Sequence, residues 1–503
     1  MKRVLGALGL AAVLLQALLS GQPAAPALAF ESPDEPLVQA FTWARHQALA
    51  YAFEDDPVGP WYEAALPGRE AFCMRDTSHQ AMGAHALGLA VHNRNMLRTF
   101  ARHVRDERDW CSLWEIDRRG HPAHADYRND QDFWYNLPAN FDVLDTCYRM
   151  FLWTGDRAYL DDPDFRSFYE RSVTDYVERW ALGADRIMKR PRMMNAKGAA
   201  DPDAKFAPAR GIPGYDEGHE DFVASLDLLA TQYAGYHAYA RILEARGDFD
   251  GARRILTRAS EVRALVNGTW WDEKTQTFFD RVTPEGRMVP RADRPWAAEL
   301  YWPVADEGPH ARGALKWLLT LVEKRNASVE EQSHHAEVLY GYGQPDAARR
   351  QILDLARPDR ERREYPEVPF SVVGAIVTGL MGVRLDPVMP GKEGELLPYF
   401  AGQFLMTVPQ LGTATAAAEL KHLPIRANLV SVRHDGARAS SFTNERGPAL
   451  VWTAALPGVH ETLLVNGRAT RAARVKLPGE RDASFVRVVV APSVTARVET
   501  PRS

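Results

Sequence analysis

The chain has 503 residues, with 61 Lys and Arg against 66 Asp and Glu, and its formal net charge is −5. Nucleic-acid-binding proteins normally carry a basic face, so this balance argues against that class. The 46% of hydrophobic and 25% of charged residues are typical of a folded globular protein and exclude a mainly disordered or fibrous chain.

The amino terminus has the pattern of a secretory signal. Lys2 and Arg3 precede an apolar stretch over residues 4–19, and Ala27-Leu28-Ala29 supplies the small residues that a signal peptidase requires. We therefore predict a signal peptide over residues 1–29, cleaved after Ala29, and a secreted or periplasmic protein. The apolar stretch is shorter than the ~20 residues that span a bilayer. No other segment is apolar enough to span, so we expect no stable membrane insertion after the signal is removed.

Export permits disulfides, but the cysteines are only three, Cys73, Cys111 and Cys147. An odd number leaves at least one thiol unpaired. A bridge between Cys111 and Cys147 and three buried free thiols are both compatible with the sequence. Neither their spacing nor their neighbours resemble a zinc site, and no metal site is predicted.

Apolar residues at helical spacing recur through residues 30–387. Helices are expected over 78–104, 141–152, 168–182, 222–245, 251–266, 308–324, 333–342, 347–355 and 370–381. Long loops rich in aromatic and acidic residues separate them. Pairs of helices joined in this way favour a mainly α domain built as a ring of helical hairpins, whose loops carry the chemistry.

The pattern changes after Pro387 to short alternating segments over 427–433, 449–454, 461–465 and 485–490. Turn signals lie between them at 434–436, 444–447 and 465–467. We predict a small antiparallel β-sandwich over 388–503. It has few acidic or aromatic clusters, so a supporting role is expected for it.

The first candidate site is Arg75-Asp76 at the start of a predicted helix. An adjacent guanidinium and carboxylate can bind two vicinal hydroxyl groups, as sugar-binding sites do. A helix cap with a surface ion pair explains the same residues. His79, one turn later, either faces the same pocket or packs in the core.

The second candidate site is the loop over 211–222. Asp216, Glu217, Glu220 and Asp221 lie close together with His219. A carboxyl group that is desolvated beside others has a raised pKa, which suits a general acid. A metal site and a solvated acidic loop remain alternatives, although the calcium-loop spacing is absent.

The third candidate site is Glu364 and Glu367, which we place in an extended loop. Pro366 and Pro369 are expected to keep this loop out of helix, so that a carboxylate could be held rigidly. A solvated loop at a helix entry is the alternative.

Further candidate residues surround these three sites. Gln332, His334 and His335 form a polar helix entry, and such histidines are often structural. Trp134 and Trp302 lie in segments that alternate aromatic and hydrogen-bonding residues, a mixture that suits both pyranose rings and hairpin packing. The sequence has no nucleophile elbow, phosphate-binding loop, dinucleotide-binding turn or zinc-protease motif, which leaves carboxylate chemistry.

These motifs resemble those of the six-hairpin glycosidase superfamily, which includes glucoamylases, trehalases and α-L-rhamnosidases. Met74-Arg75-Asp76 is similar to a sugar-binding Arg-Asp pair, and Gly214-Tyr215-Asp216 to the segment that carries the general acid. Glu364-Tyr365 is similar to the segment of the late general base, with Glu367 as the alternative. Cys73-Met74 stands where the family has Trp, and the Trp near the late Glu is absent.

The resemblance implies an (α/α)6 toroid over residues 30–387 and an inverting, exo-acting glycoside hydrolase without a cofactor. Asp216 or Glu217 would protonate the glycosidic oxygen, and Glu364 or Glu367 would activate water about 6.5–9.5 Å away. Arg75, Asp76, His79, Trp134, Tyr215, Glu220, Trp302, Gln332, His334 and His335 would bind the carbohydrate. A polysaccharide lyase, a sugar epimerase and a non-catalytic carbohydrate-binding protein are the alternatives.

Overall fold

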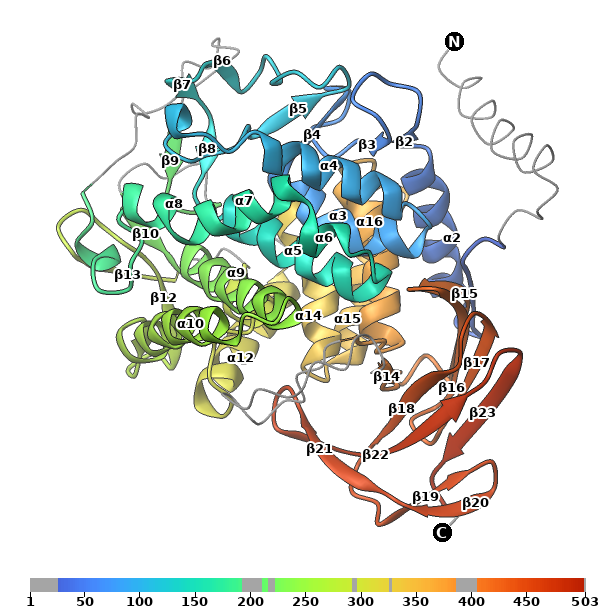
Figure 1. The fold of residues 1–503 in the computed structure, drawn as a ribbon. Coiled ribbons are helices and arrows are strands. Elements are labelled where there is room, and N and C mark those ends of the chain that lie inside the picture. The colour runs from blue at the N-terminus through green and yellow to red at the C-terminus, as the bar shows by residue number, and fades with distance from the viewer. Residues whose placement is uncertain are drawn as a thin grey trace.

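The computed structural model describes residues 26–191, 210–215, 222–291, 296–324, 328–385 and 405–501. A helical part precedes a part made of strands, as Figure 1 shows. The change from helices to strands confirms the two predicted classes of structure. Most of the predicted signal peptide and the boundary predicted between residues 387 and 388 lie outside the described residues.

Most of the helices occur close to the predicted positions, but those over 35–49, 158–161, 298–301 and 329–332 fall outside the predicted ranges. The helices are α2 (Glu35–Leu49), α3 (Met74–Ala86), α4 (Ala90–Arg102), α5 (Ala139–Thr154), α6 (Ala158–Asp161), α7 (Pro163–Val173), α8 (Asp175–Arg179), α9 (Leu226–Ala245), α10 (Phe249–Thr269), α11 (Ala298–Tyr301), α12 (Pro309–Lys324), α13 (Val329–Gln332), α14 (His335–Gly341), α15 (Pro345–Ala356) and α16 (Glu367–Gly374). The π-helical segment η3 (Ala375–Leu380) continues α16, and the short 3₁₀ segments are η1 (Asp106–Arg108) and η2 (Ile187–Lys189).

Two predicted helices are each divided in the structure. The helix expected over 78–104 is α3 and α4, and it breaks around Gly88, whose φ of +89° lies in the left-handed region that favours glycine. The helix expected over 168–182 is α7 and α8, separated at Thr174. The apolar residues keep a helical spacing across such a break because the helix that follows the turn also buries one of its faces.

The inner helices form a closed cycle of neighbours. Helix α3 packs against α5, α5 against α9, α9 against α11, α11 against α14, α14 against η3, and the α16–η3 segment against α3. Helices α2, α4, α10 and α15 pack outside this cycle, against α16, α3, α9 and α2 respectively. Most of these helices belong to one continuous hydrophobic core.

Helices α3 and α16 approach each other closely at Gly83. A Cβ atom added at Gly83 would lie 2.0 Å from the carbonyl oxygen of Phe370, a backbone atom that cannot rotate away. A Cβ at Gly374, on the other side of the same crossing, would meet its nearest atom at 3.6 Å. The crossing therefore requires glycine at position 83 but not at position 374.

We expect Gly83→Ala to lower the free energy of unfolding by roughly 1–3 kcal/mol or more, because the two backbones must move apart. The matched variant Gly374→Ala should change it by less than about 1 kcal/mol. Urea denaturation of both variants measures the difference. Equal stabilities would contradict the close approach of α3 and α16.

Short strands accompany the helical part. They are β2 (Ala52–Phe53), β3 (Trp61–Tyr62), β4 (Ala71–Cys73), β5 (Glu115–Asp117), β6 (Tyr127–Asn129), β7 (Asp132–Phe133), β8 (Tyr135–Asn136), β9 (Arg210–Ile212), β10 (Ala224–Ser225), β11 (Trp271–Asp272), β12 (Thr277–Val282) and β13 (Met288–Pro290). Strands β10 to β13 form one sheet, with β12 at its centre. Strand β10 precedes α9 and β11 to β13 follow α10, and the sequence analysis predicted none of these four strands.

The C-terminal part contains two sheets. One has the order β1-β15-β16-β17-β23-β19-β20 and the other β14-β18-β22-β21. Their strands are β1 (Ala29–Glu31), β14 (Leu405–Thr407), β15 (Ala417–Ile425), β16 (Asn428–Asp435), β17 (Ala439–Arg446), β18 (Leu450–Pro457), β19 (Thr462–Val465), β20 (Arg468–Arg471), β21 (Ala473–Leu477), β22 (Arg481–Val490) and β23 (Val494–Glu499). The pairing is antiparallel except that β14 runs parallel to β18.

Strand β1, from the start of the described chain, lies at the edge of the larger C-terminal sheet. Ala29 pairs with Lys421 and Phe30 with Leu420. Leu28 is buried, and its carbonyl oxygen accepts a hydrogen bond from Arg45 at 2.9 Å. The two ends of the described part of the chain are therefore joined in one sheet, and cleavage after Ala29 would remove the contacts of Leu28 and Ala29.

His434 joins the strands to the helices from a fully buried position. Its Nε2 lies 3.0 Å from the carbonyl oxygen of Met381, and its Nδ1 lies 2.7 Å from the Ser440 hydroxyl. Burial lowers the pKa of His434 from 6.5 to about 4. The ring is therefore neutral in the folded protein at pH values where it is protonated in the unfolded chain.

Because the folded-state pKa of His434 is depressed, its contribution to stability is complete above pH 6.5 and is lost as the pH falls toward 4. We expect the wild type to lose roughly 2–3 kcal/mol more than His434→Gln between pH 7 and pH 4. Urea denaturation at several pH values measures this, with exposed His46→Gln as the control. Parallel pH profiles for the wild type and His434→Gln would contradict it.

All three cysteines are free and buried, so of the two alternatives the structure has the one without a bridge.

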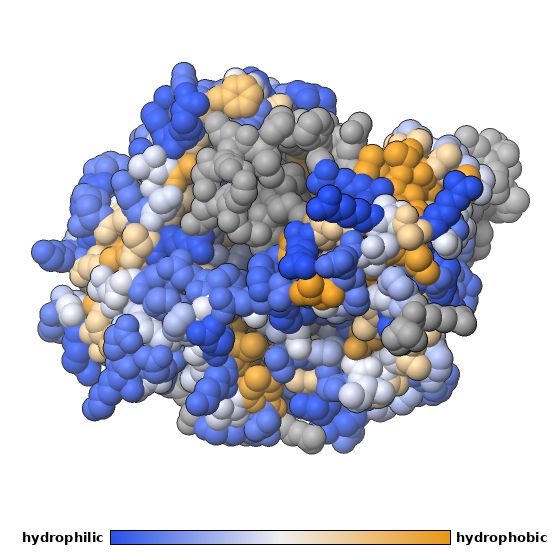
Figure 2. Space-filling model, turned by 90° about the horizontal axis from the view of Figure 1, so that it is seen from below, coloured by the Kyte–Doolittle hydropathy of each residue, from blue (hydrophilic) through white to orange (hydrophobic). Residues whose placement is uncertain are grey.

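Seen from below, the surface is mostly hydrophilic, and apolar residues gather only in small patches (Figure 2). Within the described ranges, none of the helices is both long and apolar enough to cross a bilayer.

Candidate active site

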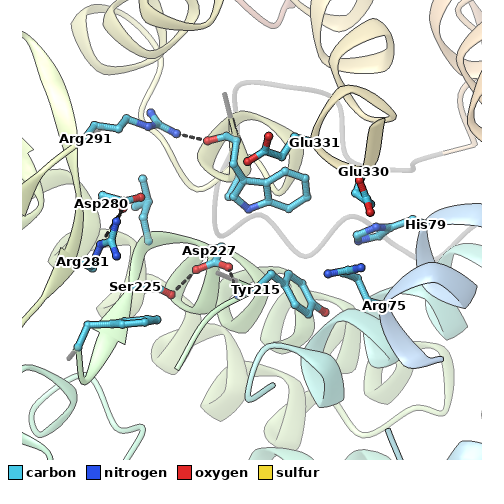
Figure 3. A pocket seen from close by; sticks show the side chains of 14 residues that line it. Arg75, His79, Tyr215, Ser225, Asp227, Asp280, Arg281, Arg291, Glu330 and Glu331 are labelled. Carbon is cyan, nitrogen blue, oxygen red and sulfur yellow. Dashed lines mark hydrogen bonds and ion pairs between the residues drawn. The ribbon is translucent and has the colours of Figure 1, made fainter. Parts of the chain in front are cut away.

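One pocket of about 690 Å³, its open mouth included, lies where several inner helices begin. Arg75 and His79 come from α3, Tyr215 follows β9, Asp227 lies in the first turn of α9, and Glu330 belongs to α13. Figure 3 shows these side chains directed toward a common space.

Arg75 and Asp76 lie at this pocket as a pair, and Tyr365 completes it. The Arg75 Nε donates to Asp76 at 3.2 Å, and the Tyr365 hydroxyl donates to the other oxygen of Asp76 at 2.6 Å. Asp76 is fully buried, and burial raises its pKa. The Arg75 guanidinium also lies 5.8 Å from the centre of the Tyr215 ring. Arg75 lines the pocket. Asp76 does not line it, and it fixes the position of Arg75 through their hydrogen bond.

His79 lies between two buried carboxylates. Its Nδ1 is 3.2 Å from Glu367 Oε1, and its Nε2 is 3.1 Å from Asp142 Oδ2, a close ion pair without aligned hydrogen-bond geometry. Burial alone would lower the pKa of His79, but the carboxylates outweigh burial and raise the pKa to about 9. His79 is therefore a cation at neutral pH and links α5 to α16.

The Oε1 atom of Glu367 has three polar neighbours. Oε1 lies 2.8 Å from the Ser333 hydroxyl and 3.1 Å from His334 Nε2, in addition to His79. Burial would raise the pKa of Glu367, but these donors and the His79 cation hold it far below its usual value. The other oxygen, Oε2, is buried and has no hydrogen-bond partner among the described residues. The carboxylate is thus kept ionised with one oxygen available.

His334 shares this environment in neutral form. Its ring lies perpendicular to that of His79, with centroids 4.1 Å apart. Burial and the neighbouring His79 cation lower the pKa of His334 to about 4. The donor atoms of His79, His334 and Glu367 lie within 4.8 Å of one another, a spacing that could hold a metal ion.

Tyr215 is held by hydrogen bonds of its side-chain hydroxyl and of its backbone N–H. Its hydroxyl donates to Asp142 at 2.9 Å, and its backbone N–H donates to Asp227 at 2.5 Å. The hydroxyl of Ser225, the N-terminal cap of α9, donates to the same Asp227. Tyr215 is therefore held in a defined position next to the predicted acid segment.

Aromatic rings form a wall around His79. The rings of Trp296, Tyr301 and Trp302 lie about 6 Å from its centroid. Trp296 lines the pocket, and its buried Nε1–H has no hydrogen-bond partner among the described residues. An aromatic face with a free donor suits a pyranose ring and its hydroxyl groups.

Glu364 and Glu367 are placed very differently. Glu364 is exposed, whereas Glu367 is buried at the first residue of α16. The loop predicted here is wrong in part, because Pro366 caps α16 and Pro369 lies within its first turn. Proline is tolerated in a first helical turn, where backbone N–H groups have no partner in the helix.

The remaining predicted residues lie around the pocket rather than in it. Gln332 points to Arg360 and Asp354, and His335 begins α14. The indole N–H of Trp134 donates to Asn136, and its ring packs against Phe222, which lines the pocket. Asp216, Glu217 and Glu220 lie outside the described residues.

Several residues of the site were missed by the sequence analysis. Asp142 and Asp227 each lie in the first turn of a helix, and Ser333 precedes α14. Asp142 stands between the apolar residues Phe141 and Val143 at the start of a predicted helix, and this acidic position was the available signal. Only the folded chain shows that these three residues reach His79, Tyr215 and Glu367.

Neither the known family models nor the curated proteins include a match to this sequence. Solved structures do match. An α-L-rhamnosidase from Dictyoglumus thermophilum has a TM-score of 0.60 at 12% identity, over 95% of this chain and 51% of that chain. A GH78 family rhamnosidase of Bacillus sp. GL1 has a TM-score of 0.55 at 14% identity, over 84% and 41%.

A putative kojibiose phosphorylase from human microbiome is also similar, with a TM-score of 0.53 at 10% identity, over 93% of this chain and 68% of that chain. The chain spans about half the length of the two rhamnosidases. At these identities the likeness is one of fold. The chain is similar in fold to these two rhamnosidases and this phosphorylase, in agreement with the resemblance inferred from the motifs.

Proposed function

We propose that the protein is an exported, exo-acting, inverting glycoside hydrolase. The observation that supports this most directly is Glu367, a buried carboxylate held ionised with one oxygen free, beside a pocket that combines Arg75 with an aromatic wall. A general base must be ionised and must present a free oxygen to water. Carbohydrate binding fits the mixture of planar rings and hydrogen-bonding groups.

In this proposal Glu367 accepts a proton from the attacking water. His79, Ser333 and His334 fix the orientation of its carboxylate, and Arg75 binds sugar hydroxyls. The acid is Asp216 or Glu217, which directly follow the anchored Tyr215 in the sequence. The inverting outcome requires the acid and base carboxyls to be about 6.5–9.5 Å apart. The proposed reaction uses no cofactor.

We further propose that the closed cycle of inner helices is the inner layer of an (α/α)6 toroid. The contacts from α3 through α5, α9, α11, α14 and η3 back to α3 support this. The candidate residues of the pocket lie near the N-terminal ends of these helices. One closed end of such a toroid would explain exo action, because a chain could enter from one side only.

The test is a screen of purified protein against aryl glycosides and oligosaccharides, with α-L-rhamnosides among them. Released reducing sugar, without the ultraviolet absorbance of an unsaturated product, would support hydrolysis. The anomeric configuration of the first product, followed by NMR, would then test inversion. Absorbance that rises with cleavage would instead indicate a lyase, and binding without any cleavage would indicate a carbohydrate-binding protein.

A further inference from the structure

Three donor atoms of different side chains converge next to the pocket. They are His79 Nδ1, His334 Nε2 and Glu367 Oε1, here called the His-His-Glu cluster. Oε1 lies 3.2 Å from the first nitrogen and 3.1 Å from the second. Two ligand atoms on a tetrahedral Zn²⁺ stand about 3.4 Å apart. The observed separations are thus close to those of a metal site.

The surroundings of the cluster match those of metal-binding histidines. Asp142 Oδ2 lies 3.1 Å from His79 Nε2, the ring nitrogen that faces away from Glu367. A carboxylate in that position holds the proton on Nε2, so a metal ion that binds at Nδ1 displaces only the Nδ1 proton of the His79 cation. The Ser333 hydroxyl supports the Glu367 carboxylate in the same way at 2.8 Å.

Polar atoms without partners also point to a ligand. His334 Nε2 and Glu367 Oε2 are buried without a hydrogen bond of good geometry to any described residue. Buried polar atoms normally have partners, and those that lack them require an explanation such as a bound ion. His79 also lines the pocket, so the cluster lies directly next to it.

We propose that the His-His-Glu cluster binds one divalent transition-metal ion of the Zn²⁺ class. Two imidazole nitrogens and one carboxylate oxygen are donors that such ions prefer. Ca²⁺ and Mg²⁺ require mainly oxygen ligands and are not expected to bind here.

The bound ion would regulate the site rather than serve its chemistry. It would occupy Glu367 Oε1 and so compete with the role of that carboxylate toward water. The ion-binding inference itself stands on the donor geometry and does not depend on the proposed hydrolase activity. It is therefore tested by binding alone, in the absence of any carbohydrate.

Isothermal titration of the full chain with ZnCl₂, after chelator treatment and with excess Mg²⁺, tests the proposal. We expect one strongly bound ion per chain. His334→Ala and Glu367→Gln should each weaken it by about 100-fold or more, and Asp142→Asn by about 10–100-fold. The matched control is His85→Ala, which removes another buried histidine of α3 whose ring contacts the Pro424 carbonyl oxygen instead.

Circular dichroism identifies any variant that fails to fold, and Glu367→Gln keeps the size of the side chain it replaces. The visible spectrum of the Co²⁺ form gives a second measurement, because tetrahedral coordination produces intense bands. Bands that are present in the wild type and absent from folded Glu367→Gln would support the site. Zinc binding that is undetectable in the wild type, or unchanged in both ligand variants, would overturn the proposal whatever the hydrolase assays show.

Discussion

Replacing Glu367 with Gln should lower kcat for hydrolysis by roughly a hundred- to ten-thousand-fold, with little change in KM. The amide has the same shape and can still accept the hydrogen bond of Ser333, so binding of the sugar is preserved. It cannot take a proton from water, because it is not ionised and is far less basic than the carboxylate. Initial rates with an aryl glycoside that the protein cleaves measure the effect.

The matched control for this prediction is Glu364→Gln. Glu364 was the first candidate from sequence, three residues earlier, but its side chain is exposed and does not line the pocket. We expect its kcat to stay within a few-fold of the wild type. If Glu364→Gln abolishes turnover and Glu367→Gln retains it, Glu364 is the base, and the role assigned to the buried carboxylate is wrong.

Replacing Glu299 with Ala should lower the free energy of unfolding by about 3–5 kcal/mol. Glu299 receives two hydrogen bonds from Arg291, at 2.6 and 2.8 Å, and the side chains are 0% and 3% exposed. The Arg291 guanidinium also lies 3.6 Å from the Trp317 ring centre. Removing the carboxylate leaves a positive charge buried without its counterion, which is the costly change. Chemical denaturation at neutral pH measures it.

Two further variants separate the charge effect from loss of packing. Exposed Glu307→Ala should change the free energy of unfolding by less than about 0.5 kcal/mol. The double variant Arg291→Met/Glu299→Leu should recover most of the loss, because an apolar pair of similar volume can replace a buried ion pair. A double variant as unstable as Glu299→Ala would show that the unpaired Arg291 charge is not the cause of the loss.

The predicted elements agree best with the structure where the apolar residues keep one spacing, helical or alternating, over the whole element. Helix α5 was predicted over 141–152 and spans Ala139–Thr154, and the hairpin turn at Asn466-Gly467 lies between β19 and β20. Both residues of that turn have positive φ, which Asn and Gly tolerate. Errors occur at Gly88, where a helical pattern continues through a turn, and at the short strands β10 to β13.

The candidate residues show the same limit. Arg75, His79, Tyr215 and Glu367 could be singled out because their residue types suit carbohydrate chemistry, and all four reach one site. Glu364 and Glu367 could not be distinguished, because a carboxylate looks the same in sequence whether it is buried or exposed. That difference depends on the position of α16 against α3.

The sequence by itself determined the succession of a helical and a β-rich part and the carboxylate and aromatic composition of the site, since these follow from local periodicity and residue type. Only the tertiary structure decided which carboxylate is buried, that His79 joins Asp142 to Glu367, and that β1 completes the C-terminal sheet. These contacts join residues 63 to 392 positions apart. Burial and electrostatic pairing depend on distance in space, and local sequence patterns do not encode it.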